Sequence, residues 1–136
     1  MELNELVLNL PALFGALMIA ILFLQSGLDK VFDWRGNREW LTGHFAETFM
    51  APMVPLLLAV ITVMELATGA AAAVGLIYFV VTGSTLIIFY SAALGAASLA
   101  SLFFGQRVAK DYAGAAVIVP YFLLTMAVIY LTNPVR

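Results

Sequence analysis

The sequence predicts an all-α membrane protein: one domain over residues 1–136, folded as a bundle of four transmembrane helices with a short interfacial helix in the first loop. Hydrophobic residues make up 64 % of the chain and charged residues only 10 %, whereas soluble domains are about half apolar and about a quarter charged. The apolar residues form runs long enough to cross a bilayer, which takes about 20 residues per helix. The net charge is −2, so the sequence gives no sign of the basic surface that nucleic-acid binding requires.

The residue types that carry thiol and metal chemistry are nearly absent. The chain has no cysteine and one histidine, His44. These counts exclude thiol–disulfide exchange, thiolate metal sites and a haem held by two histidines of this chain. A redox function would therefore need an organic carrier or a partner subunit. Glu2 and Glu5, with no basic residue beside them, are untypical of a cleaved signal peptide, so we expect this end to be retained.

The first span is predicted over residues 10–32, a run that stays apolar until its last two turns. The polar connection after it is predicted to contain a short helix from Arg38 to Met50. Apolar and aromatic residues recur there at i, i+1, i+4 and i+5, which is typical of a helix lying in the membrane interface. Trp34 and Trp40 fit the pattern of interfacial anchors.

The second and third spans are predicted over residues 54–76 and 82–105. Between residues 54 and 105 the only charged side chain is that of Glu65, and such a run of about 50 residues is too long for one span. Two glycines and a threonine interrupt it, which places the turn within Gly75–Gly83. The last span follows the polar loop GQRVAKD and covers residues 112–131.

Basic residues set the expected orientation. Four spans place both termini on one side of the membrane and the first and third loops on the other. The basic residues on the loop side are Lys30, Arg35, Arg38, Arg107 and Lys110, and only Arg136 lies on the terminal side. The positive-inside rule therefore predicts cytoplasmic loops and external termini.

Glu65 is the first candidate for a functional side chain. It lies about 11 residues inside the second span, near the bilayer midplane, where an unpaired carboxylate costs several kcal/mol. We expect it to face the bundle and either pair or hold a proton, with Thr62 and Gly69 on the same face. Such a carboxyl handles protons or binds a ligand. The alternative is a structural, hydrogen-bonded acid.

Polar residues also form a stripe at the end of the first span: Gln25, Ser26, Asp29, Lys30 and Asp33. Counted from the cytoplasmic helix ends, Gln25 is about 10 Å deep and Glu65 about 16 Å, so one helical turn separates them. We therefore expect a polar path from the loop surface to Glu65. The alternative is that Asp29 and Lys30 only extend from a helix end to the membrane surface.

The last span adds a third polar element. Pro120 removes a backbone donor and frees a carbonyl one turn earlier, and Tyr121 and Thr125 lie beside it. A plain proline kink is the alternative. The full set of residues expected in a ligand pocket around Glu65 is Gln25, Ser26, Lys30, Thr62, Tyr121 and Thr125.

Charges near the loops predict an ion network that clamps the first span to the third loop. Its members are Asp29, Asp33, Arg107, Lys110 and Asp111. Asp111 also suits the N-cap of the last span, since an acid is favourable at a helix N-terminus. We expect His44 to be a surface residue and not a ligand, because no second ligand lies near it.

Small residues recur every four positions and predict close helix packing. These sets are Ala92, Ala96 and Ala100; Ala93, Ala97 and Ser101; and Gly69 with Ala73. A tightly packed bundle and a dimer interface both explain this pattern.

The segments FLQSGLDKVFDW, ELATGAAAAVGL and DYAGAAVIVPYF resemble the DoxX family of small bacterial membrane proteins. The resemblance covers most of the chain and implies a four-helix bundle in the bacterial inner membrane. It marks Ser26, Gly27, Lys30, Asp33, Glu65 and Gly69. The family takes its name from a membrane subunit of a thiosulfate:quinone oxidoreductase. A related branch handles disulfides with cysteines, which this chain lacks, so a thiol–disulfide role is excluded for the chain alone.

Three functions follow as hypotheses. The leading one is a membrane subunit of a quinone-linked oxidoreductase or respiratory assembly, in which the pocket around Glu65 meets a quinone head or relays a proton. The second is a structural or assembly subunit without chemistry of its own. The third is a small proton-coupled exporter, although the key acid of such proteins is typically in the first span. Expected partners are membrane lipids and other membrane subunits or a second copy; no metal or covalent cofactor is expected.

Overall fold

The structure is a computed structural model that describes residues 2–135, which are mostly helical and contain no β-strand. The helices are α1 (Leu3–Leu8), α2 (Leu10–Phe32), α3 (Trp34–His44), α4 (Val54–Thr82), α5 (Leu86–Val108) and α6 (Tyr112–Thr132), with a 3-10 turn at Ala51–Met53. By length and composition, α2, α4, α5 and α6 can each cross a membrane. The predicted fold class, a four-span all-α membrane protein, is confirmed.

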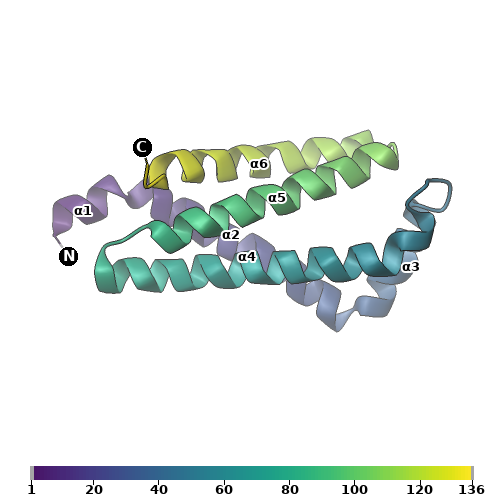
Figure 1. Cartoon of the computed structure of the whole chain (residues 1–136), viewed down its shortest axis with the longest axis horizontal. Coiled ribbons are helices and arrows are strands. Elements are labelled where there is room, and N and C mark those ends of the chain that lie inside the picture. The colour runs from purple at the N-terminus through teal and green to yellow at the C-terminus, as the bar shows by residue number, and fades with distance from the viewer. Residues whose placement is uncertain (1, 136) are drawn as a thin grey trace.

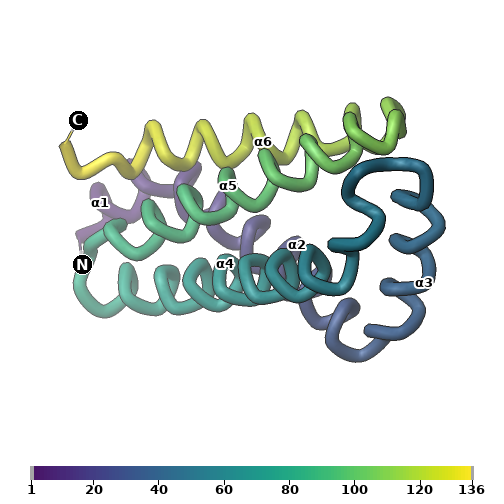
Figure 2. Tube along the Cα trace, turned by 45° about the vertical axis from the view of Figure 1, so that its right-hand side comes forward, coloured from purple at the N-terminus to yellow at the C-terminus, as the bar shows by residue number. Residues whose placement is uncertain are grey.

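The four long helices lie side by side in a bundle (Figure 1). Both ends of the chain lie at one end of the bundle, here called the terminal end. Helix α3 and the turn between α5 and α6 lie at the opposite end, here called the loop end (Figures 1 and 2). The terminal end and the loop end thus carry different parts of the chain, as four spans require.

The turn between the second and third spans lies later than the predicted end at residue 76. Helix α4 continues to Thr82, and Gly83 ends it with a φ of 75°, a left-handed conformation that glycine adopts without steric cost. Gly75 is instead a packing residue. A Cβ there would lie 2.9 Å from the backbone nitrogen of Ile88, so a larger side chain would push α4 and α5 apart.

Two further glycines bring α2 and α4 into backbone contact. A Cβ on Gly69 would lie 2.7 Å from the backbone nitrogen of Leu24, and one on Gly27 would lie 3.2 Å from that of Leu66. Membrane helices gain little from hydrophobicity against each other and depend on such close packing. These contacts fix both the height of α2 along α4 and the face that it turns toward α4.

Helices α4 and α5 diverge from the terminal end toward the loop end (Figures 1 and 2). At the loop end a separate apolar group, here called the loop-end cluster, packs between chain segments. Its buried members are Phe45, Met50 and Val54, with Leu41, Leu57 and Val108 packed against them. The ring of Phe45 lies against Gly105, where a Cβ would be 3.4 Å from its Cζ. The segment after α3 thus covers the space between the diverging helices.

The helix predicted in the first loop is present with different bounds, since α3 starts at Trp34 and ends at His44. Its end follows from a hydroxyl turn. The Thr48 hydroxyl donates to the Phe45 carbonyl and accepts from the Met50 N–H, which gives the backbone an alternative to continuing the helix.

The small residues on α5 divide between two environments. Ala92 and Ala96 are buried in the bundle, whereas Ala97, Ala100 and Ser101 are exposed. The two buried alanines therefore pack within the chain, and the three exposed residues form an outer face without large side chains.

Candidate functional site

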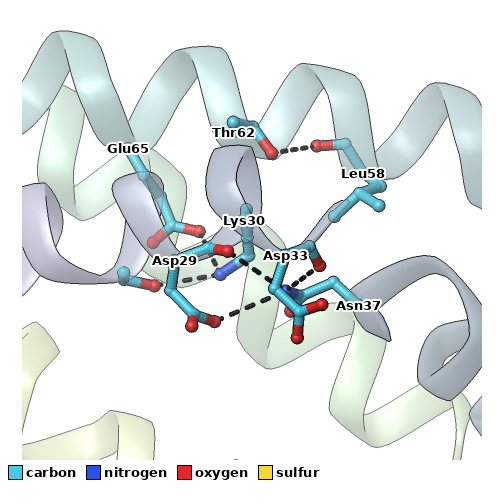
Figure 3. A network of polar contacts seen from close by, with 8 residues as sticks. Asp29, Lys30, Asp33, Asn37, Leu58, Thr62 and Glu65 are labelled. Atoms are coloured by element: carbon cyan, nitrogen blue, oxygen red, sulfur yellow. Dashed lines mark hydrogen bonds and ion pairs between the residues drawn. The ribbon is translucent and has the colours of Figure 1, made fainter. Parts of the chain in front are cut away.

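A buried ion pair connects α2 to α4. The ammonium nitrogen of Lys30 lies 2.9 Å from Oε1 of Glu65, and the two side chains point toward each other (Figure 3). The Glu65 side chain is 1 % exposed and that of Lys30 is 16 % exposed. Of the two outcomes expected for Glu65, pairing is the one found. Lys30 turns into the bundle and does not extend to the membrane surface.

Ser26 completes this group, because the Lys30 ammonium donates to its hydroxyl at 2.9 Å. Apart from the ion pair with Lys30, no donor within residues 2–135 reaches Oε1 of Glu65. An ammonium has three donors, of which Ser26 takes one and Glu65 faces another. One N–H of the Lys30 ammonium is therefore left to donate to a ligand, and the Glu65 carboxylate can accept a further hydrogen bond.

The face of α2 decides which polar residues meet Glu65. Gly27 packs on α4, and Lys30 lies three residues further on the same side. Gln25 and Asp29 each lie two residues from Gly27, about 160° around a helix, and both are exposed. The prediction that Gln25 belongs to the pocket is therefore wrong, and the stripe is divided between an inner and an outer face.

The outer part of the stripe bonds locally. The Asn37 side chain donates to the Asp33 carbonyl at 2.9 Å and reaches the Asp29 carboxylate at 3.4 Å (Figure 3). These contacts stabilise the corner between α2 and α3. Asn37 had no place in the expected network, although its i+4 and i+8 spacing from the two acids is visible in the sequence.

The predicted ion network between the first span and the third loop does not form among the described residues. Arg107 stacks over the ring of Tyr112 at 4.4 Å from its centroid. Asp111 accepts from the Gly114 N–H at 2.9 Å and caps α6, as predicted. No ion pair of Lys110 is found within residues 2–135. Most of these charged side chains instead contact residues three to eight positions away in the chain, so they need no ion pair between the first span and the third loop.

His44 is not the surface residue that was expected, because its side chain is only 14 % exposed. Its Nε2 lies 2.7 Å from Oε1 of Gln106, its ring stacks on Trp40 with centroids 4.4 Å apart, and Asp111 is 3.9 Å away. His44 thus ties α3 to α5. No group of three metal-ligating side chains is present in the described part of the chain.

The hydroxyls expected near Glu65 bond to their own helices. Thr62 donates to the Leu58 carbonyl at 2.6 Å and Thr125 to the Phe122 carbonyl at 2.6 Å. A buried threonine in a helix commonly satisfies its hydroxyl this way. Tyr121 packs against the main apolar core. Thr125 and Tyr121 therefore do not line a pocket with Lys30, contrary to the prediction.

A cavity of about 370 Å³ lies beside the ion pair, between α4 and α5 at the loop end, and α3 covers it. We call it the loop-end cavity. Its polar lining comes from Lys30, Asn37, His44, Ser101 and Gln106, and its apolar lining includes Trp40, Leu57, Ile61, Met64 and Leu102. No described residue of α6 lines it. Glu65 does not line it either and lies behind Lys30.

Comparisons with models of protein families, with curated proteins and with solved structures give no match to this chain.

Proposed function

We propose that this protein is a small integral membrane subunit of a quinone-linked oxidoreductase or respiratory assembly, and that the loop-end cavity holds the quinone head. The observation that supports this most is the placement of Lys30. Its buried ammonium lines a cavity whose walls are otherwise mostly apolar. Ligand sites commonly combine an apolar lining with a few placed polar groups.

The chemistry of the cavity suits a flat ring with carbonyl oxygens. The free donor of Lys30 provides a hydrogen bond to one carbonyl, while Trp40 and the aliphatic side chains of α4 contact the ring. Glu65 holds the ammonium at the edge of the cavity. Its unused acceptor capacity also makes it a candidate to take a proton when a quinol is oxidised.

Sequence features support the same proposal. Ser26, Lys30 and Glu65, which meet in one group, are among the positions marked by the DoxX resemblance. With no cysteine and one histidine, the chain would receive or pass electrons through a partner subunit. The proposal places the protein in the bacterial inner membrane, with the loop end on the cytoplasmic side.

Purification from native membranes in mild detergent tests the proposal. Extracted lipids and co-purified proteins are identified by mass spectrometry, for the unchanged chain and for Lys30→Met. The proposal expects quinone at a near-equal molar ratio in the unchanged chain, and its loss in the variant. Equal, trace amounts of quinone in both preparations would contradict it.

A non-catalytic assembly subunit is the second candidate, and the outer face of α5 favours it. Ala97, Ala100 and Ser101 are exposed and small, so another membrane helix can approach closely there. In this case Ala97→Leu and Ala100→Leu would break a complex, while Lys30→Met combined with Glu65→Gln, which leaves no unpaired charge, would keep it intact. The opposite pattern favours the quinone-binding subunit.

A further inference from the structure

We infer that the loop-end cavity opens sideways into the bilayer between α4 and α5, and that its ligand is a tailed molecule carried by the membrane. The head would occupy the cavity while a hydrocarbon tail passes through this opening into the lipid. The inference rests on the proposed function for the identity of the head, and it adds the class of ligand and the path of its tail.

Three residues that line the cavity are exposed: Trp40 on α3, and Val60 and Ser101 on the outer surface of the bundle. Val60 is 48 % exposed and Ser101 is also exposed, yet both line the same cavity as the buried Leu58. Val60 lies on α4 and Ser101 on α5. The cavity wall is therefore continuous with the outer surface along the line between these two helices.

The depth of the opening places it in the lipid. Val60 lies six residues after the start of α4 and Ser101 seven residues before the end of α5, which corresponds to about 9–11 Å along each helix. Neither residue is charged, and Lys30, the charged residue of the cavity lining, comes from α2. A surface of this kind at this depth faces acyl chains and not water.

Helix α3 lies over the loop end of the cavity, where the lining residue Trp40 is 59 % exposed. Helix α3 is tied to α5 by the 2.7 Å contact between His44 and Gln106, and the Phe45 ring packs on Gly105 next to it. A ligand from the water would have to displace these contacts. Between α4 and α5, the exposed lining residues are Val60 and Ser101.

The surface beyond the opening leaves room for a tail. Two turns further along α4 from Val60 lies Ala67, and one turn back along α5 from Ser101 lies Ala97. Both residues are small and exposed. No bulky side chain at these positions blocks a hydrocarbon chain that leads toward the middle of the membrane.

The test compares two quinones with the same head, one with a ten-carbon tail and one with no tail. Equilibrium binding to the protein in nanodiscs is followed by quenching of Trp40 fluorescence, with Trp34→Phe as the common background. Val60→Phe and Ser101→Phe fill the opening from its two walls. Val80→Phe is the matched control, since Val80 is on the same helix but far from the opening, is 69 % exposed and does not line the cavity.

Because the tail of a bound ligand occupies the opening, Val60→Phe and Ser101→Phe should each weaken binding of the tailed quinone about tenfold or more. The tailless quinone should bind these variants within about threefold of the unchanged affinity, and Val80→Phe should alter the affinity for neither quinone.

If both quinones bind and both filled variants keep the affinity for the tailed one, the sideways opening is wrong and the proposed function stands. If neither quinone binds the unchanged protein, the proposed function is wrong and the inference falls with it.

Discussion

The ammonium of Lys30, two residues before the end of one membrane helix, lies 2.9 Å from the carboxylate of Glu65 inside the next. The pair is buried and shares its ammonium with Ser26. Burying two charges is costly even when they pair, and removing one partner costs more, because the other charge is then left uncompensated. This relationship gives the first prediction.

Glu65→Gln should destabilise the protein by about 3 kcal/mol, since Lys30 would keep a charge without its partner. Lys30→Met combined with Glu65→Gln should recover much of this loss, because no unpaired charge remains. Unfolding in mixed detergent micelles measures the free energies. If the effects of the single variants simply add in the double variant, the two side chains are not coupled.

Gly69→Ala should destabilise the bundle by about 1–3 kcal/mol, because the new Cβ would meet the backbone of α2 and overpack the contact. Gly43→Ala is the control, since nothing lies within 4 Å of a Cβ there. In helix α3 that change should be neutral or stabilise by up to about 1 kcal/mol. Equal effects of the two changes would contradict the close approach of α2 and α4.

Gly83→Ala should cost about 1–2 kcal/mol, because a residue with a Cβ is strained at the φ of 75° found there. Gly83→Asn should cost less, as asparagine tolerates this conformation better than alanine does. The same unfolding measurement checks the order glycine, asparagine, alanine. An alanine variant as stable as the unchanged protein would place the turn elsewhere.

Asp111→Ala should destabilise α6 by about 1 kcal/mol through loss of the N-cap bond to Gly114. Asp111→Asn should retain most of the stability, because asparagine is an equally good N-cap. If asparagine costs as much as alanine, the charge of Asp111 toward His44 matters more than the cap.

The four long helices could be predicted from the length of the apolar runs alone. Each of the four spans was located, and Glu65 stood out as the only charge in residues 54–105. The predicted turn within Gly75–Gly83 included the residue that makes it, Gly83. Its position among the two glycines could not be decided, because one sequence does not distinguish a glycine that turns the chain from one that packs against a neighbour.

The partner of Glu65 was harder to predict. Lys30 was in the expected stripe, but Gln25 was placed nearer to Glu65 because both helices were counted from their ends. The face and height of α2 depend on Gly27 and Gly69, whose contacts exist only in the folded bundle. The bond between His44 and Gln106 joins residues far apart in the chain, and no local pattern indicates it.

The central claim is that Lys30 binds a quinone head in the loop-end cavity, and equilibrium quinone binding tests it most directly. The tailed quinone is titrated into nanodiscs that hold the unchanged protein, Lys30→Met, or Arg38→Gln as a control from the exposed side of α3. We expect Lys30→Met to weaken binding about tenfold or more, as loss of a charged hydrogen bond would, and Arg38→Gln to bind normally. Equal affinity in all three proteins, or no binding to the unchanged one, would contradict the claim.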